Sequence, residues 1–306
     1  MMGRMDKLKQ GAGGVYVVSL VAIILWGLSY LWSQRLLIYD VPVEYFVFVR
    51  VLLAGLLLLL LNLSTGHSLR IHRGDWWKFL LLAFCEPFVY FVCETYGIDL
   101  TGSPTLSALI IASTPILSVF AGICFFRERI TWLNILGILV CLGGIVMVTA
   151  SAGELGPHFV LGVLLLLAAV VAEVGHASFT KSLSGDYTPQ VIVMYQFLFG
   201  SVYLLPLFVT KGLPGFLPVW LSWDVMGPVL CLALLCSGVA FTLWVSSIKR
   251  LGVAKSSIFL AMIPVVTAIS GQLMGQEFLS RLQWTGIAVA VVGVVLSQIA
   301  CKRKKE

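Results

Sequence analysis

Long runs of apolar residues, separated by short polar segments, extend along the whole chain. A helix needs about 20 predominantly apolar residues to cross the hydrocarbon core of a bilayer, and runs of that length recur here. The pattern predicts ten such helices, at residues 10–34, 41–63, 75–97, 100–126, 130–150, 157–182, 187–210, 225–248, 256–276 and 282–301. We therefore expect an all-α integral membrane protein with ten transmembrane helices.

The composition excludes an ordinary soluble protein. The chain is 59% hydrophobic and 11% charged, with a mean hydropathy of +1.01, whereas soluble domains carry about 25% charged residues. The net charge of +6 does not indicate a nucleic-acid partner, because the Lys and Arg residues lie in short loops between apolar runs. The expected partners are the lipid bilayer and a small-molecule substrate, and the oligomeric state is left open.

The distribution of basic residues predicts the orientation. Cytoplasmic loops are enriched in Lys and Arg. If the N-terminus is inside, sixteen of the 20 Lys and Arg residues fall on the cytoplasmic side and three outside, with Arg50 left within the membrane. We expect a multi-pass protein of the cytoplasmic membrane, with cytoplasmic tails at residues 1–14 and 301–306.

The sequence contains an internal repeat. A shift of 149 residues superposes one half on the other without a gap, aligning Ser107 with Ser256, Pro115 with Pro264, Gly122 with Gly271, Glu128 with Glu277, Gly137 with Gly286 and Gly144 with Gly293. The predicted repeats span residues 15–150 and 157–300. Each holds five helices, an odd number, so the second must cross the membrane in the opposite sense. Two inverted five-helix repeats around a central cavity are a recurring design of secondary transporters.

These residues resemble the EamA-type branch of the drug/metabolite transporter superfamily. The resemblance rests on Trp26-Gly27, Arg50, the stretch from Thr101 through Pro115, Arg127-Glu128-Arg129 and Gly137 to Gly144, and on a second copy from Lys249-Arg250-Leu251-Gly252 through Pro264 and Glu277 to Gly286. It implies a basket of ten helices whose cavity is lined mainly by helices 1, 3, 4, 6, 8 and 9, with helices 5 and 10 outside. Similar proteins move amino acids, other metabolites or drugs, often as exporters. One departure is Glu173, which stands near the repeat equivalent of Trp26.

Ionisable residues at membrane depth are the first candidates for the site, because burying one unpaired costs about 2.5–3.5 kcal/mol. Glu86, Tyr90 and Glu94 are spaced i, i+4 and i+8, which predicts one polar helix face toward the cavity. The carboxylates are expected to bind a substrate amine or a proton, or else to be static partners of Arg50. For Arg50 the choices are a structural ion pair and a clamp for a substrate carboxylate.

Helix 157–182 supplies a second candidate pair. Glu173 and His176 are spaced i, i+3 and can form either a coupled proton site or a satisfied polar pair. Four aromatic residues could stack on an organic substrate or only pack between helices: Trp26, Tyr30, Tyr195 and Trp244.

Four further residues are expected to be structural or hinge positions. Pro115 and Pro264 are repeat equivalents that interrupt helices, which favours a shared mechanical role. Glu128 and Glu277 fall at helix ends, where interfacial hydrogen bonding is expected.

The motifs that are absent narrow the function. The chain lacks the P-loop GxxxxGK[ST] of ATP-driven pumps, and it lacks GxSxG and HExxH. We expect no catalytic residues, no metal and no cofactor. The sequence predicts a secondary transporter, an exporter of a small organic metabolite such as an amino acid, working by alternating access with proton coupling. The alternatives are a channel or receptor-like membrane scaffold and, less favoured, an intramembrane enzyme.

Overall fold

The computed structural model describes residues 2–66, 68–117, 131–150, 156–214, 221–252, 256 and 258–299, with side chains from Gly14 onward except at positions 258, 298 and 299. The first half contains α1 (Met2–Ile38), α2 (Val43–Thr65), α3 (Trp76–Ala83), η1 (Phe84–Val89), α4 (Tyr90–Thr101), α5 (Pro104–Ile111) and α7 (Trp132–Ala150). The second contains α8 (Phe159–Leu183), α9 (Pro189–Leu207), η2 (Phe208–Gly212), α10 (Trp223–Leu230), η4 (Cys231–Ala240), α11 (Phe241–Leu251), η5 (Ile258–Met262), α13 (Ile263–Leu273) and α14 (Arg281–Ile299). The described elements are all helical, which confirms the predicted class.

Within these described ranges, seven helical segments are long and apolar enough to cross a membrane. They are Gly14–Ile38, Val43–Thr65, Trp76–Thr101, Trp132–Ala150, Phe159–Leu183, Pro189–Gly212 and Trp223–Leu251. Shorter apolar helices occupy Pro104–Leu117, Phe259–Leu273 and Arg281–Ser297. Each segment overlaps one of the apolar runs, because the length of such a run is set by the thickness of the bilayer core.

The helix expected over residues 75–97 is interrupted at Glu86. This residue has an extended backbone, with φ −146° and ψ 123°, and a cis peptide bond joins it to Pro87. The residue before a proline is disfavoured in the α region, so the expectation of one regular helix face through Glu86 is wrong at its first residue. The side chain of Glu86 therefore does not follow the register of Tyr90 and Glu94.

The run at 100–126 is also divided. Gly102 takes a left-handed conformation with φ +66°, and Ser103 accepts a hydrogen bond from the backbone N of Leu106 at 3.2 Å to begin α5. Pro104 stands in the first turn of α5, where its missing N–H is tolerated. Residues 118–126 lie outside the described part.

Equivalent breaks precede the two repeated prolines. A turn at residues 112–113 separates α5 from the helical turn that contains Pro115, and the 3-10 segment η5 precedes α13, which contains Pro264. Both helices are therefore interrupted at the same place in the repeat.

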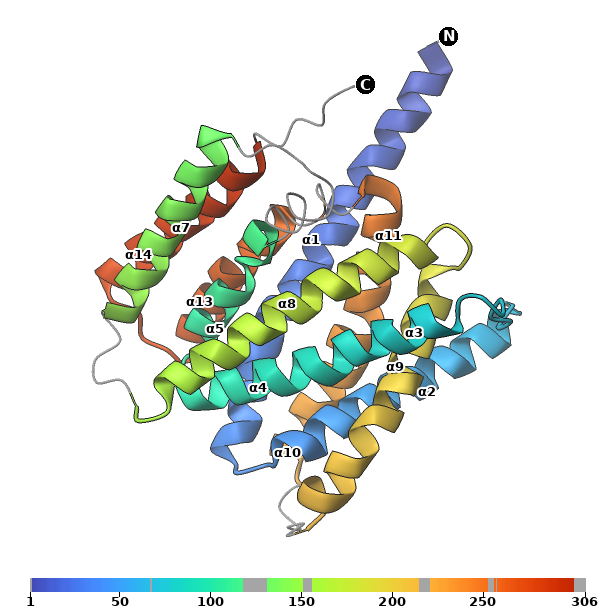
Figure 1. Ribbon diagram of the computed structural model, residues 1–306, viewed down its shortest axis with the longest axis horizontal. Helices are drawn as coiled ribbons and strands as arrows, with labels where there is room; N and C mark the ends of the chain where they lie inside the picture. The colour runs from blue at the N-terminus through green and yellow to red at the C-terminus, as the bar shows by residue number, and fades with distance from the viewer. Residues whose placement is uncertain are drawn as a thin grey trace.

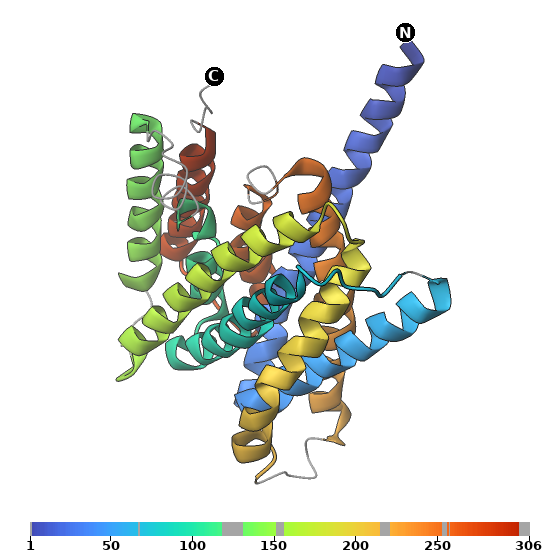
Figure 2. The same ribbon diagram turned by 45° about the vertical axis from the view of Figure 1, so that its right-hand side comes forward.

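Helices α7 and α14 form a pair set apart from the other helices (Figures 1 and 2). A Cβ on Gly137 would lie 2.4 Å from the backbone N of Ser297, and one on Gly144 would lie 2.4 Å from that of Ala290. Contacts that advance along α7 while they recede along α14 show that the two helices are antiparallel. Small residues let the backbones approach this closely.

The remaining helices surround α1. Helix α4 packs on α8, α2 packs on α9, and α1 contacts η4, α11 and α13 (Figure 1). Glycines again mark the close crossings, since a Cβ on Gly97 would lie 2.5 Å from the Leu166 side chain and one on Gly27 would lie 2.5 Å from that of Val266. The interior between these helices contains the candidate functional site.

Candidate functional site

A small cavity lies where helices from both halves of the chain meet. It leaves about 30 Å3 for the centres of water molecules, which is room for about two of them. Its lining combines ionisable, aromatic and aliphatic side chains: Trp26, Ser29, Tyr30, Arg50, Glu86, Tyr90, Phe91, Glu94, Ile111, Thr114, Glu173, Phe241, Leu260 and Ile263. Seven of the ten predicted site residues therefore line this cavity, and His176, Tyr195 and Trp244 do not.

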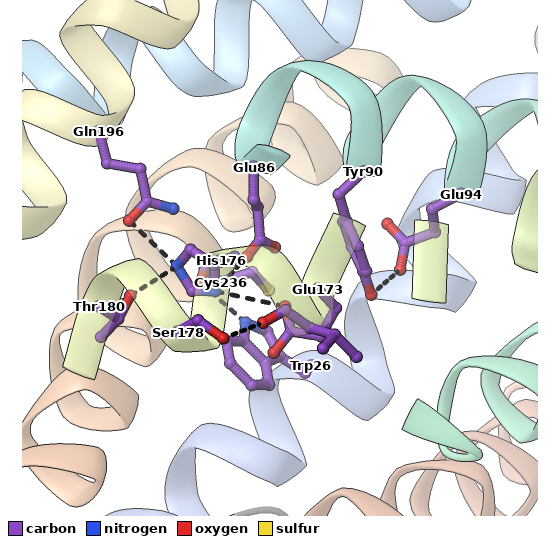
Figure 3. Close-up of polar contacts among 11 residues, drawn as sticks. Trp26, Glu86, Tyr90, Glu94, Glu173, His176, Ser178, Thr180, Gln196 and Cys236 are labelled. Carbon is purple, nitrogen blue, oxygen red and sulfur yellow. Dashed lines mark hydrogen bonds and ion pairs between the residues drawn. The ribbon is translucent and has the colours of Figure 1, made fainter. Parts of the chain in front are cut away.

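Two of the lining carboxylates hold an imidazole between them (Figure 3). His176 Nδ1 lies 2.9 Å from Glu86 Oε2 and 3.3 Å from Glu173 Oε2, and His176 and Glu86 are almost completely buried. Glu173 and His176 come from neighbouring turns of α8, whereas Glu86 comes from the helix break in η1. The predicted pair is therefore part of a cluster of three groups.

The other nitrogen of the imidazole is also hydrogen-bonded. His176 Nε2 lies 3.2 Å from Thr180 Oγ1 and 3.3 Å from Gln196 Oε1 (Figure 3). With acceptors available to both nitrogens, the surroundings suit an imidazolium that donates on each side. Sequence reasoning missed Thr180 and Gln196. The signal for Gln196 was a lone amide in the apolar run at 187–210, and Thr180 is one turn from His176.

Glu94 occupies a separate part of the cavity. Its Oε1 accepts a hydrogen bond from the Tyr90 hydroxyl at 3.0 Å (Figure 3), and both residues are buried in α4. The i, i+4 spacing predicted this contact.

Arg50 does not form the predicted ion pair. Its Nε donates to Ser237 Oγ at 3.2 Å, and its guanidinium carbon lies 4.0 Å from the centre of the Phe91 ring. Arg50 is 2% exposed, and its Nη1 has no hydrogen-bond partner among the described residues. None of the described carboxylates forms a direct ion pair with it, although Glu94 and Glu86 are the charged carboxylates that act on it across the cavity. Sequence spacing places residues at a depth but does not orient side chains on different helices.

Trp26 and Tyr30 face the cavity as predicted, but the other two aromatic candidates do not. Trp26 Nε1 donates to the Cys236 carbonyl at 3.3 Å, and Trp244 packs behind Trp26 with 5.3 Å between ring centres. Tyr195 donates its hydroxyl to the Leu69 carbonyl. Trp244 and Tyr195 are absent from the cavity lining in this structure. Both serve helix packing.

Glu277 lies at a helix end and joins the two halves of the chain. It accepts hydrogen bonds from Ser103 Oγ at 2.7 Å, from the Thr105 backbone N at 3.2 Å and from the Thr105 hydroxyl. A carboxylate at these free N–H groups is favoured at the N-terminus of α5. Its repeat equivalent Glu128 lies outside the described residues.

The buried cluster also has the donor types of a metal site. Glu86, Glu173 and His176 each offer one ligand atom, and these atoms lie within 4.8 Å of one another. However, His176 Nδ1 and Glu86 Oε2 already lie 2.9 Å apart as a close ion pair, so the two groups can neutralise each other without a metal ion. The absence of a metal stays a prediction.

Comparison with known proteins identifies the class. The EamA-like transporter family matches residues 13–150 and, a second time, residues 160–298. With its apolar helices and relatives named as transporters, the protein is a multi-pass membrane transporter. The chain belongs to the EamA-like family, and the resemblance to drug/metabolite transporters is confirmed.

Individual relatives give the range of similarity. The uncharacterized transporter YetK of Bacillus subtilis (strain 168) is 28% identical over 297 residues, 95% of this chain and 88% of its own. A probable terminal-alkyne amino-acid exporter of Streptantibioticus cattleyicolor is 31% identical over 62% of each chain. The uncharacterized inner membrane transporter YedA of Escherichia coli (strain K12) is 25% identical over 89% of this chain and 87% of its own. A protein of known crystal structure, 18% identical, covers 94% of this chain and 98% of its own with a TM-score of 0.72, which shows a shared fold.

Proposed function

We propose that the protein is a secondary carrier that exports a small organic metabolite, such as an amino acid, by alternating access coupled to protons. The observation that carries the proposal is the buried cluster in which His176 lies between Glu86 and Glu173. Glu86 belongs to the first family match and the other two residues to the second, so a movement between the halves would change the cluster.

A ten-helix inverted repeat would provide that movement. Its support is the pairing of equivalent helices, because a Cβ on Gly137 would lie 2.7 Å from the Gly293 carbonyl and one on Gly144 would lie 2.5 Å from that of Gly286. These contacts are reciprocal under the 149-residue shift, and antiparallel equivalents are what opposite orientations produce. The contact of α2 with α9 also joins equivalent segments, because α2 shifted by 149 residues overlaps α9.

The proposed halves are residues 15–150 and 157–300, with both tails in the cytoplasm. The N-terminal end of α1 and the C-terminal end of α14 lie at the same end of the molecule (Figures 1 and 2), as an even number of crossings requires. The excess of Lys and Arg in the loops on that side supports its cytoplasmic location.

Proton coupling follows from the electrostatics of the cluster. One proton more or less changes its charge by one unit, and a charge in a low-dielectric cavity interacts several times more strongly than in water. The two states of an alternating carrier would hold the cluster differently, so each proton binds one state better and shifts the populations. The breaks before Pro115 and Pro264 are the proposed positions of bending.

The substrate class rests on chemistry and on one relative. The cavity combines carboxylates, a guanidinium and aromatic rings, which suits an amphipathic metabolite. The printed name of the Streptantibioticus relative is that of an amino-acid exporter, which supports both the class and the direction.

Substrate flux in proteoliposomes under an imposed pH gradient tests the proposal. Amino acids and related metabolites are screened with the parent, Glu86→Gln and Glu173→Gln, and with Glu44→Gln as the control. Glu44 is a buried carboxylate that accepts a hydrogen bond from Tyr96 away from the cavity. We expect uphill movement in the parent and the control and only downhill movement in the two cluster variants.

Other outcomes separate the alternatives. Movement that never exceeds equilibration would overturn the coupling and favour a channel. Chemical conversion of a tested compound would indicate an enzyme.

A further inference from the structure

Two opposite charges line the same cavity without touching. Arg50 reaches it from α2 and Glu94 from α4, and both side chains are buried. No ion pair joins them in the described structure. Opposite charges held apart in a buried space leave a gap that a ligand with both charges would fill.

The hydrogen-bond partners that each group has among the described residues are neutral. Arg50 donates one hydrogen bond to the Ser237 hydroxyl and rests on the Phe91 ring, which leaves Nη1 free of a partner. A guanidinium has five N–H donors in a planar fork that matches a carboxylate. What this arrangement lacks is an anion within hydrogen-bonding distance of the guanidinium.

Glu94 is in the complementary situation. Its hydrogen bond at 3.0 Å comes from the neutral hydroxyl of Tyr90 (Figure 3). Glu86 and Glu173 instead share the imidazole of His176. Glu94 is therefore the cavity carboxylate that forms no direct ion pair with a described cation, although the charge of Arg50 acts on it across the cavity.

We propose that Arg50 and Glu94 form a site for the zwitterionic head group of an α-amino acid. The guanidinium of Arg50 binds the substrate carboxylate, and the carboxylate of Glu94 binds the substrate ammonium. The substrate side chain packs on the apolar lining, which includes Trp26 and Phe241. This inference rests on the proposed transport function. It assigns substrate binding to Arg50 and Glu94 and proton binding to the cluster around His176.

The division has a consequence for specificity. A zwitterion pairs both buried charges and adds no net charge to the cavity. An amine without a carboxylate leaves Arg50 unpaired, and an acid without an amine leaves Glu94 unpaired, so each must bind weakly. Because the cavity has room for only about two waters, binding of an amino acid requires the surrounding helices to separate.

Equilibrium binding tests the site without any gradient. The full-length protein in nanodiscs is incubated with tritiated L-phenylalanine, L-leucine, L-methionine and L-threonine, and bound label is counted. We expect at least one of them to bind, with its methyl ester and its N-acetyl derivative competing at least about 30-fold more weakly. If none binds at millimolar concentration, or if the ester competes as well as the free acid, the site is overturned.

Variants assign the two ends of the ligand. Arg50→Gln is expected to weaken binding of the free amino acid about 30-fold and to leave binding of its methyl ester unchanged. Glu94→Gln is expected to weaken binding of the free amino acid about 30-fold and to leave binding of its N-acetyl derivative unchanged. If Arg50→Gln does not fold, Ser237→Ala takes its place. It retains the charge of Arg50 but removes its hydrogen-bond partner, and it should weaken binding of the free acid by a smaller factor. Glu44→Gln should bind as the parent does. An equal loss for all analogues in a folded variant contradicts the assignment.

The flux experiment distinguishes this proposal from the function beneath it. Proton-coupled movement of a non-zwitterionic metabolite, with no amino acid bound, would overturn only the head-group site. Amino-acid binding that depends on Arg50 and Glu94, with flux that ignores the pH gradient, would overturn only the coupling.

Discussion

His176 Nδ1 lies 2.9 Å from Glu86 Oε2, across the contact between α8 and the helix break in η1. The imidazole is the shared partner of two buried carboxylates, the second being Glu173 at 3.3 Å. Removing one partner of a buried ion pair costs far more than removing all of them, because the charge left behind is unpaired.

His176→Gln should therefore lower the free energy of unfolding by about 3–5 kcal/mol. The triple variant Glu86→Gln/Glu173→Gln/His176→Gln should recover most of that loss, since it leaves no buried charge in the cluster. Unfolding by denaturant in detergent micelles measures both, and losses that simply add across the three substitutions would refute the coupling.

The α7–α14 contact gives a prediction with a control on the same helix. Gly137→Ala places a Cβ 2.4 Å from the Ser297 backbone and should destabilise the protein by about 1–3 kcal/mol. Gly143→Ala meets nothing within 4 Å and should stabilise the protein by up to about 1 kcal/mol, because alanine has the higher helix propensity. Thermal unfolding in detergent compares the stability of the two variants. Equal changes in stability would mean that helix propensity, and not packing between α7 and α14, determines the effect of the added methyl group.

Glu277 should stabilise the start of α5. Glu277→Ala removes its contacts with Ser103 and Thr105 and is expected to cost about 1–2 kcal/mol, as the loss of a helix cap does. Glu277→Gln retains an acceptor and should cost less. A double-mutant cycle with Thr105→Val measures the coupling energy between Glu277 and Thr105, which join the two halves. Strictly additive losses of stability in the two single variants would show that this coupling does not exist.

Asp75 gives a pH dependence outside the membrane-spanning helices. Hydrogen bonds from Lys78 at 2.7 Å and from the Tyr187 hydroxyl at 2.9 Å hold the pKa of Asp75 below its ordinary value of 3.8. A lowered folded-state pKa stabilises the protein above pH 3.8 and loses that contribution as the pH falls through the lowered pKa. Asp75→Asn should thus be modestly less stable than the parent at pH 7.

Thermal unfolding across pH 3–7 checks this prediction. The difference between Asp75→Asn and the parent should narrow below about pH 4. Asp186→Asn, which removes an exposed carboxylate from the nearby turn, serves as the control and should follow the parent throughout. A constant difference at every pH would assign the effect to lost packing instead of charge.

The placement of the helices was predictable because bilayer thickness sets the length of an apolar run. The spacing of glycines in the repeat also pointed to close helix contacts, which Gly137 and Gly144 make. The break at Glu86 was harder to predict, since a proline inside an apolar run is compatible with a kinked helix or with an extended residue. Only packing of η1 against α8 and α9 selects between them.

The candidate site was predictable where its residues share one helix. The i, i+3 spacing of Glu173 and His176 and the i, i+4 spacing of Tyr90 and Glu94 each correspond to a contact. Contacts between helices were not predictable, because spacing along the chain does not orient neighbouring helices. Arg50 therefore found Ser237 in place of a carboxylate.

The two sides of the cavity differ although the helices that form them are repeat equivalents. Glu86, Glu94 and Glu173 come from the contact of η1 and α4 with α8, whereas the contact of α1 with η4 and α11 supplies Trp26 and Phe241. In the proposed mechanism, exchanging the conformations of the halves would not recreate the same surroundings for a bound molecule. The inward-open and outward-open forms should thus hold substrate with unequal affinity, and loading alone would draw the carrier toward the tighter form.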